Sequence, residues 1–211
     1  MVEVPPDGVL TGDDGISRCW WCGTDPLYRS YHDSEWGRPV GDDRRLFEKI
    51  CLEGFQSGLS WLTILRKREN FRSAFKSFDL ETVARFNSRS VERLMGDAGI
   101  VRNRAKIEAT INNARRCLDL VDELGSLAAY VWSFEPRRPA RRLDRATLIG
   151  IGTGEEAVAM SKDLKKRGWA FVGPTTIYSV MESVGLANDH MSACDIRAEV
   201  DRERAAFRRP R

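Results

Sequence analysis

The sequence predicts a mainly α-helical protein, and three observations lead to that prediction. From residue 18 onward, apolar residues recur three or four positions apart in nearly every long segment. Residues that favour helix N-termini stand at the start of several of these segments. Between the segments we find no reliable pair of strands, no long repeat and no low-complexity linker. We therefore expect one helical domain over residues 18–197, between a flexible N-terminal tail, residues 1–17, and a charged C-terminal tail, residues 198–211.

Two long helices are predicted in the first half of that domain. "DDRRLFEKICLEG", residues 42–54, repeats apolar residues at helical spacing, and Asp42 or Asp43 can cap its N-terminus. "SWLTILRKRENFRSAFKSF", residues 60–78, continues the same period and begins at Ser60, whose hydroxyl can accept a hydrogen bond from the first turn. Both stretches are expected to turn an apolar face toward a core.

The helices that follow are shorter, with one exception. Asp79 can start one of them and Ser88 or Ser90 another, whereas residues 102–124 form a long helix. Further on, "TGEE", residues 153–156, has the Thr-x-x-Glu form of a capping box. A helix is therefore expected to begin there.

The glycine-rich stretch "GIGTGEE" superficially suggests a nucleotide-binding loop. It lacks the Lys-Ser/Thr pair of a phosphate loop, and no strand with an acidic residue about 20 positions on accompanies it. We interpret it as a loop that leads into the helix of residues 155–168, which Gly168 ends. "GPTTIYSVMESVG", residues 173–185, is predicted to be the last core helix.

Composition and charge are ordinary for a soluble globular domain, with 42% hydrophobic and 31% charged residues. No apolar run approaches the roughly 20 residues of a membrane span, and the N-terminus lacks the features of a signal peptide. We therefore expect a cytoplasmic protein without a membrane partner. The net charge is +3, and arginine and lysine gather in four runs that are interleaved with Trp and Phe. These runs are either solvated faces or a surface for a polyanion.

Five cysteines in a cytoplasmic chain indicate metal ligands or free thiols, because disulfides are rare in that compartment. Cys51 and Cys117 fall within apolar helical patterns, where a thiol is most simply a small buried hydrophobe. Cys19, Cys22 and Cys194 therefore remain as candidate ligands.

The two histidines suggest a metal site with these cysteines. His32 lies 13 residues after Cys19, and His190 lies four residues before Cys194, so that one helical face can present the second pair. Two His and two Cys are a complete ligand set for tetrahedral zinc, with no position open to water, so such a metal would be structural and would join distant segments. The alternatives are unrelated histidines and buried thiols, or Cys22 in place of one ligand, because Cys-x-x-Cys is itself a metal-pair spacing.

Several long motifs resemble 3-methyladenine DNA glycosylase I. They are "RCWWCGTDPLYRSYHDSEWG", "CLEGFQSGLSWLTILRKRENFRSAF", "DAGIVRNRAKIEATINNA", "LKKRGWAFVGPTTIYSVM" and "GLANDHMSAC", and together they span residues 18–194. The resemblance implies a helix-hairpin-helix DNA glycosylase fold that excises 3-methyladenine from alkylated, double-stranded DNA. It also implies one structural Zn²⁺ per chain, held by Cys19, His32, His190 and Cys194.

The same resemblance implies the residues of a base pocket. The matching positions are Trp21, Tyr28, Tyr31, Glu53 and Trp61. The sequence departs from the family pattern in two small ways. Cys22 is not a ligand position in that pattern, and Phe55 occupies a variable place between Glu53 and Gln56.

Physical chemistry gives the pocket residues a common purpose. A base must leave the duplex stack before its glycosidic bond can be reached, and aromatic faces then stabilise it by roughly 1–3 kcal/mol. 3-Methyladenine in DNA is cationic, so a carboxylate such as Glu53 attracts it and accepts a charge-assisted hydrogen bond from its amine. Neutral adenine offers no cation to offset the desolvation of that carboxylate. The alternatives are core packing for the aromatic residues and an exposed helix end for Glu53.

The expected chemistry is undemanding, because a cationic base is already a good leaving group. If zinc binds both histidines, neither remains as a general base, and no lysine is placed clearly enough to form a Schiff base. We therefore expect a monofunctional N-glycosyl hydrolase that acts as a monomer. Glu53 would be its catalytic residue, because it selects the base and favours a cationic transition state.

A DNA-holding element is predicted at about residues 79–122. "LMGDAGIVRNRAKI" has the order of helix, glycine turn and helix found in a helix-hairpin-helix. Backbone amides at Gly96, Gly99 and Ile100 are expected to meet a phosphate there. The alternative is a plain turn between two core helices.

A second DNA contact is predicted at "QSGLSW". This stretch is expected to place Gly58 and Leu59 near the gap that a flipped base leaves. Leu59 would then act as an apolar wedge between the neighbouring bases.

Two other classes of function fit parts of this pattern. A non-catalytic, zinc-stabilised DNA-binding protein would use the basic runs and the Cys/His set, but would have no need of Glu53 between Trp21 and Trp61. A metallohydrolase would need a zinc with an open coordination position, which four protein ligands do not leave. Within the glycosylases, Phe55 can alter the pocket and broaden the substrate range.

Overall fold

The structure is a computed structural model that describes residues 5–137, 143–151 and 153–211. As predicted, it is mainly helical. The helices are α1 (Pro26–Ser34), α2 (Asp43–Gln56), α3 (Trp61–Ala74), α4 (Leu80–Ala84), α5 (Ser88–Gly96), α6 (Arg104–Leu124), α7 (Leu127–Trp132), α8 (Arg145–Ile151), α9 (Glu155–Lys166), α10 (Pro174–Ser183) and α11 (Arg197–Ala206), with short 3-10 turns η1 (Trp20–Cys22) and η2 (Lys76–Phe78). Within the described ranges, no helix has the length and apolar character needed to cross a membrane.

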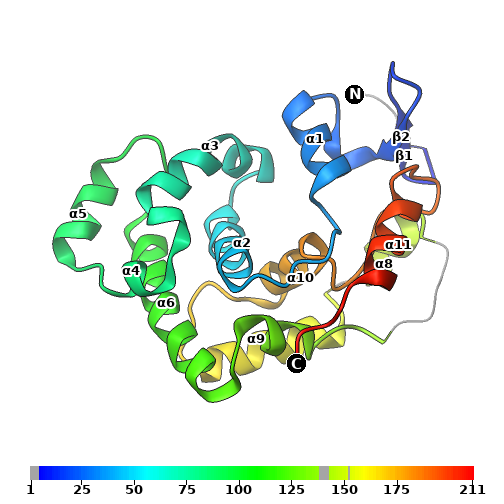
Figure 1. The fold of residues 1–211 in the computed structure, drawn as a ribbon. Helices are drawn as coiled ribbons and strands as arrows, with labels where there is room; N and C mark the ends of the chain where they lie inside the picture. Colours follow the sequence, from blue (N-terminus) through cyan, green and yellow to red (C-terminus); the bar gives the residue numbers. More distant parts are fainter. Residues whose placement is uncertain (1–4, 138–142, 152) are drawn as a thin grey trace.

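Helix α2 lies at the centre of the larger group of helices (Figure 1). It packs against α3, α6, α7 and α10. Asp42, the first of the two aspartates proposed as its cap, accepts a hydrogen bond from the Arg45 amide (2.9 Å). Residues 51–55 are all buried, so the end of the helix is enclosed on every side. The helix therefore carries Glu53 into the interior and away from solvent.

The predicted helix starts agree with the structure for α3 and α4, and α5 begins at Ser88, one of the two serines predicted to start it. Ser60 caps α3, and Asp79 caps α4. Helix α5 is capped by Asn87, and not by Ser88 or Ser90. The Asn87 side chain accepts from the amides of the second and third residues after it, which is the geometry that an N-cap asparagine favours.

The predicted capping box at residues 153–156 is also wrong. Gly154 is the N-cap residue of α9, with φ of 68°, and no described side chain caps the first turn. The end of the same helix agrees with the prediction, because Gly168 follows it with φ of 82°. The acidic first turn and basic last turn of α9 complement its dipole instead.

The N-terminal segment is not a loose tail where the structure describes it. Strand β1 (Val9–Thr11) pairs antiparallel with β2 (Ser17–Cys19), with Val9 opposite Cys19. Strands of three residues are too short to show an alternating pattern, so the sequence analysis found no strand pair. The pairing fixes Cys19 at the end of β2.

The predicted charged C-terminal tail contains helix α11, whose charged residues attach it to the domain. Arg38 pairs with Glu199 (3.0 Å) and with Glu203 of α11. Arg204 donates to two carbonyl oxygens of the segment that follows α10. Val200, a residue of α11, is fully buried.

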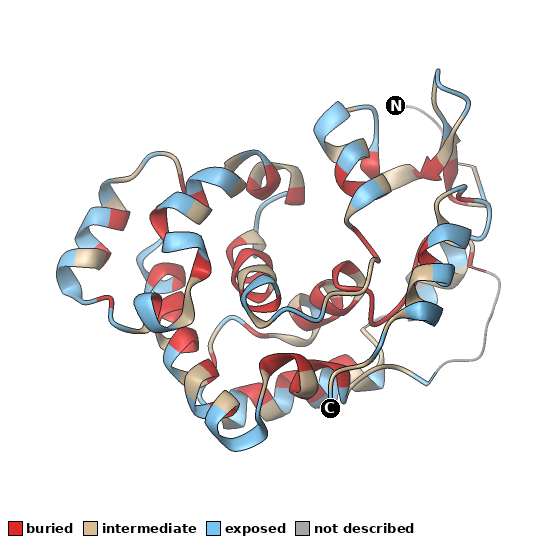
Figure 2. Ribbon diagram, in the orientation of Figure 1, coloured by how far each residue is buried: buried red, intermediate tan, exposed pale blue. Residues whose placement is uncertain are grey.

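Two apolar clusters organise the described residues. The larger one surrounds α2 and α10, where buried residues prevail, whereas exposed residues prevail on the outer helices α5 and α11 (Figure 2). The smaller one consists of Val9, Cys19, Met191 and Cys194. It joins the strand pair to the segment between α10 and α11, on the side of the molecule that also carries α1 and α8 (Figure 1).

Candidate functional site

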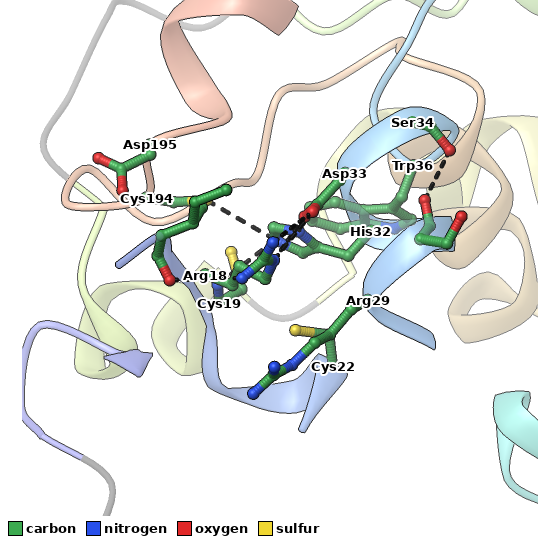
Figure 3. Close-up of polar contacts among 12 residues, drawn as sticks. Arg18, Cys19, Cys22, Arg29, His32, Asp33, Ser34, Trp36, Cys194 and Asp195 are labelled. Carbon is green, nitrogen blue, oxygen red and sulfur yellow. Dashed lines mark hydrogen bonds and ion pairs between the residues drawn. The ribbon is translucent and has the colours of Figure 1, made fainter. Parts of the chain in front are cut away.

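Four buried side chains from distant segments converge on one point. Cys19 ends β2, His32 lies near the end of α1, and His190 and Cys194 lie between α10 and α11. Their four ligand atoms all lie within 4.8 Å of one another. Figure 3 shows Cys19, His32 and Cys194 grouped together. The residues predicted as ligands are thus brought together by the fold.

The separations of these atoms suit a tetrahedral zinc ion. Cys194 Sγ lies 3.6 Å from His190 Nδ1 and 3.7 Å from His32 Nε2. Cys19 Sγ lies 3.7 Å from His190 Nδ1. Bonds of about 2.3 Å to sulfur and 2.0–2.1 Å to nitrogen, at tetrahedral angles, place neighbouring S and N atoms about 3.6 Å apart. The donor set and its spacing therefore fit Zn²⁺.

A second layer of hydrogen bonds orients both imidazole rings. His32 Nδ1 lies 2.7 Å from Asp33 Oδ1, and Arg18 Nε donates to both oxygens of Asp33 (2.9 Å each). His190 Nε2 lies 3.2 Å from the carbonyl oxygen of Trp36. These contacts leave Nε2 of His32 and Nδ1 of His190 directed at the thiols, as the outer partners of metal-binding histidines do.

Cys22 stands outside this cluster. Its thiol is buried against the carbonyl oxygen of Gly23 (4.0 Å), and Figure 3 shows its sulfur apart from the others, beside Arg29. The arrangement gives no support to the alternative in which Cys22 replaces one of the four ligands. Cys51 and Cys117 are buried in the core, as predicted.

An aromatic pocket of about 200 Å³ lies beside the Cys/His cluster. All five residues predicted for a base pocket line it, namely Trp21, Tyr28, Tyr31, Glu53 and Trp61. The sequence analysis did not assign its other lining residues, Trp20, Trp36, Gln56, Leu148, Ser179 and Glu182. The "WW" pair and the glutamine one turn after Glu53 were visible signals, whereas the residues from α8 and α10 reach the pocket through tertiary packing alone.

The aromatic rings form a continuous wall. Ring centroids lie 5.2 Å apart for Trp21 and Tyr28, 6.4 Å for Tyr28 and Tyr31, and 5.5 Å for Tyr31 and Trp61. The Trp21 ring also meets the His32 ring at 5.2 Å, so the Cys/His cluster supports one end of the wall. Burial raises the pKa of Tyr28 to about 12 and that of Tyr31 well above its usual value. Both phenols therefore keep their protons.

Glu53 is the carboxyl group of this pocket, and it is only 5% exposed. The alternative of an exposed glutamate at a helix end is therefore wrong. Burial raises its pKa to about 7, although the nearby Lys49 amine acts in the opposite direction. At neutral pH the carboxylate is thus poorly hydrated and close to taking up a proton. A positive charge nearby would favour its ionised form.

Lys49 is a further residue of this site that the sequence analysis did not assign. Its Nζ lies 3.7 Å from Glu53 Oε1 and donates to Tyr31 Oη (2.5 Å). It also lies over the rings of Trp61, at 3.9 Å, and Tyr31, at 4.5 Å. Burial lowers the pKa of Lys49 to about 8. Its position four residues before Glu53 on a helix was the signal that could have found it.

The loop between α2 and α3 borders the pocket. A second cavity of about 260 Å³ shares Glu53 with the aromatic pocket and extends along this loop to Thr175 at the start of α10. Gly58 makes the turn with φ of 82°, and Leu59 is 42% exposed. An apolar side chain is therefore presented to solvent beside the pocket, where the sequence analysis placed a wedge.

The predicted phosphate-binding turn is the loop between α5 and α6. Gly96 is exposed at the end of α5, whereas the Ile100 side chain is buried. The Gly99 amide donates to the Asp97 carboxylate (2.8 Å), and the Ile100 amide donates to the Asp97 carbonyl oxygen (3.4 Å). A phosphate at this turn would therefore compete with Asp97 for two of the three predicted amides.

Comparison with known proteins relates this geometry to a family. Residues 21–198 match the methyladenine glycosylase family. DNA-3-methyladenine glycosylase 1 of Escherichia coli (strain K12) is 49% identical over 180 residues, which cover 85% of this chain and 96% of the E. coli protein. DNA-3-methyladenine glycosylase of Haemophilus influenzae is 43% identical over 179 residues, with coverage of 84% and 96%. The structure of 3-methyladenine DNA glycosylase I from Staphylococcus aureus, solved to explain 3-methyladenine recognition, has a TM-score of 0.80 at 36% identity and covers 85% of this chain and 96% of its own.

Proposed function

This chain belongs to the methyladenine glycosylase family, and from that premise we propose that its aromatic pocket receives a methylated adenine flipped out of DNA. The chain is a DNA-3-methyladenine glycosylase, as its curated relatives are named. The observation that carries the proposed mechanism is a carboxylate, Glu53, 5% exposed and set in a wall of aromatic rings. A non-catalytic DNA-binding module has no use for such a group.

Selection of the damaged base would follow from charge. The rings of Trp21, Tyr28 and Trp61 offer stacking faces that accept any base, at roughly 1–3 kcal/mol each. Glu53 distinguishes among bases, because its desolvated carboxylate is stabilised by a cation and gains less from neutral adenine. The protonated phenols of Tyr28 and Tyr31 can donate hydrogen bonds to ring nitrogens or to the carboxylate.

The same charge assists cleavage. When the bond between the base and C1′ breaks, its electron pair passes to the base, which becomes neutral, and positive charge develops on the sugar. Glu53 supplies negative potential near this sugar, in a pocket where water screens it poorly. Water then adds to C1′ and releases a proton. Neither histidine is placed to act as a base, since both lie in the Cys/His cluster, so we propose a monofunctional hydrolase.

We also propose one structural Zn²⁺ per chain, held by Cys19, His32, His190 and Cys194. The matched S–N separations and the outer hydrogen bonds of both histidines support it. Four protein ligands leave no position for water or substrate, so the metal would supply stability and no chemistry. It would hold the Trp21 end of the aromatic wall.

Contact with double-stranded DNA is proposed for two elements. Leu59, exposed beside the pocket, would enter the gap left by the flipped base. The α5–α6 pair would form a helix-hairpin-helix that binds the phosphate backbone, with Gly96 as its most accessible predicted residue. The monomeric state and the cytoplasmic location remain predictions from the sequence.

Base release from methylated duplex DNA tests the mechanism. We expect the protein to free 3-methyladenine with little 7-methylguanine, and Glu53→Gln to lower the rate about 10- to 100-fold, because a charge-assisted contact of about 1.5–3 kcal/mol is lost. Freed bases are identified by chromatography.

Glu123→Gln is the control, because Glu123 lies near the end of α6, outside the aromatic pocket, where it pairs with Arg167 (2.7 Å). This variant should keep the full rate. A normal rate in Glu53→Gln, or abundant release of 7-methylguanine, would contradict selection by Glu53. DNA binding without release of any base by the folded wild-type protein would favour the binding module.

A further inference from the structure

The Lys49 amine is buried beside the Glu53 carboxylate, although excision of a base does not by itself require an amine at this place. It lies 3.7 Å from Glu53 Oε1 and 2.5 Å from Tyr31 Oη, with the Trp61 ring 3.9 Å below it. The side chains of the ion pair are only 14% and 4% exposed. In the empty pocket, therefore, a cation already occupies one side of the carboxylate that is meant to attract a cationic base.

Lys49 and Glu53 face different cavities. Glu53 lines the aromatic pocket, whereas Lys49 lines a smaller cavity of about 50 Å³. Tyr31 and Trp61 line both. A cationic base stacked on the Trp61 ring would share that ring, as well as the Glu53 carboxylate, with the Lys49 amine. The smaller cavity is large enough for water, so it offers a path for a proton.

The other charged groups around the amine largely balance one another. Glu35, after α1, and Glu48, on α2, favour its protonated form, and Arg68 of α3 opposes it. Arg68 is paired with Glu35 (2.6 Å), and Arg72 is paired with Glu48 (2.8 Å). The main counter-ion of the amine is therefore the carboxylate of the pocket.

On the pocket side, none of the described residues that line the pocket with Glu53 is a lysine or an arginine. Tyr28 and Tyr31 keep their phenolic protons. Glu182, from α10, lines the same pocket, and the remaining contacts are aromatic, apolar or neutral polar. A positive charge that enters the pocket thus competes directly with Lys49 for Glu53.

We propose that Lys49 is a removable counter-ion, which neutralises Glu53 while the pocket is empty and gives up its proton when a cationic base enters. This inference rests on the proposed function of Glu53. Two cations that share one buried carboxylate and the Trp61 ring repel each other, and the charge of the methylated base comes from alkylation, so the base stays cationic near neutral pH while it is attached to DNA. The lysine can lose its proton, because its pKa of about 8 is already close to neutral pH.

The proposed cycle balances in protons and charge. On binding, Lys49 releases one proton through the smaller cavity and becomes neutral. Cleavage leaves the electron pair of the glycosidic bond on the base, which becomes uncharged, while water adds to C1′ and releases its own proton. Glu53 then lacks a cation, so Lys49 takes up a proton again. The ion pair re-forms, and the pocket loses its hold on the neutral product.

Two small probes separate charge from shape. 3,9-Dimethyladenine owes its positive charge to alkylation, as the damaged nucleotide does, whereas free 3-methyladenine is uncharged in alkaline solution. Near pH 7.5 part of Lys49 is still protonated, so the wild-type protein should release a large fraction of one proton per bound 3,9-dimethyladenine. Calorimetric titration in buffers of different ionisation enthalpy counts that proton. A release near zero would overturn the inference.

Two variants test the same point by affinity. Lys49→Arg keeps a permanent charge, because a guanidinium does not lose its proton, and Lys49→Met removes the charge. At about pH 9 the wild-type amine is mostly neutral, so wild type and Lys49→Met should bind the cationic probe equally well, and Lys49→Arg about tenfold more weakly. Equal binding by all three would overturn the inference.

Controls distinguish this inference from the proposed function. Neutral 3-methyladenine should bind all three proteins alike, which also reports that the variants are folded. If Lys49→Arg and wild type bind the cationic probe equally while wild type still excises 3-methyladenine in a Glu53-dependent way, the counter-ion role fails and the glycosylase mechanism stands. If no base is excised, the proposed mechanism itself fails.

Discussion

Glu53 and Lys49 are two ionisable side chains that are buried beside each other. Each is nearly enclosed, and burial moves the pKa of Glu53 up to about 7 and that of Lys49 down to about 8. Alone, either charge would be costly to desolvate, and together they remain poised between an ion pair and two neutral groups. The sequence could predict Glu53, because a carboxylate among apolar residues, glycines and a tryptophan is unusual. It could not predict how Lys49 is enclosed, because Tyr31 and Trp61 come from two other helices.

The pH profile of base release follows from this pair. In the proposed mechanism Glu53 acts as a carboxylate, and its pKa lies above the ordinary 4.5, so the rate should fall as the pH drops through about 7 and level off near the rate of Glu53→Gln. Because Lys49 lowers the pKa of Glu53, Lys49→Met should move this fall to higher pH. Single-turnover rates measured across the range would show it. A profile that is flat down to the pKa of an ordinary glutamate would contradict the assignment.

At the scale of elements, the sequence predicts best what is local. Ser60 and Asp79 cap the helices that follow them, as expected, because a cap is an interaction between a side chain and amides only two or three residues away. The strand β1 and the helix α11 were missed for the opposite reason. Their partners are distant or their length is too short for a period, and tertiary contacts such as that of Arg38 with Glu199 stabilise them.

The loop between α2 and α3 gives a prediction at the same scale. Leu59→Ala should lower base release from duplex DNA by about tenfold, because an apolar group that fills the gap of the flipped base would be removed. Its affinity for free 3-methyladenine should not change, since Leu59 does not line the aromatic pocket. Leu124→Ala, at a leucine of similar exposure that lines neither cavity, is the matched control. Equal duplex activity of the two variants would exclude the wedge.

At the scale of the whole molecule, the site is assembled from both halves of the sequence. The four residues of the Cys/His cluster and five residues of the aromatic pocket could be predicted from a resemblance carried by long motifs, and the fold brings each set together. The residues that α8 and α10 contribute, such as Leu148 and Ser179, could not be predicted. Their side chains are ordinary for their helices, and the packing of those helices alone turns them toward the pocket.

Removal of the metal should test this assembly. We expect one zinc per chain by elemental analysis, lost in Cys194→Ser and kept in Cys22→Ser. Metal-free protein should lose about 3 kcal/mol or more of stability, which would lower its melting temperature by roughly 6–12 °C. A cobalt-substituted protein should show four protein ligands. A spectrum that requires a water ligand would instead indicate a catalytic metal.

The Cys/His cluster also bears on the order in which the protein becomes active during synthesis. Cys19 and His190 are 171 positions apart, and they meet in the small cluster that supports the Trp21 end of the pocket. While the ribosome is still adding the last twenty or so residues, α2 and α3 can already fold around their own core. The segment with Trp21, Tyr28 and Tyr31 can then contact α2 and α3, but it lacks the cluster that supports its Trp21 end. A chain cut short before Cys194 would therefore carry Glu53 on a folded helix bundle beside an aromatic wall without that support.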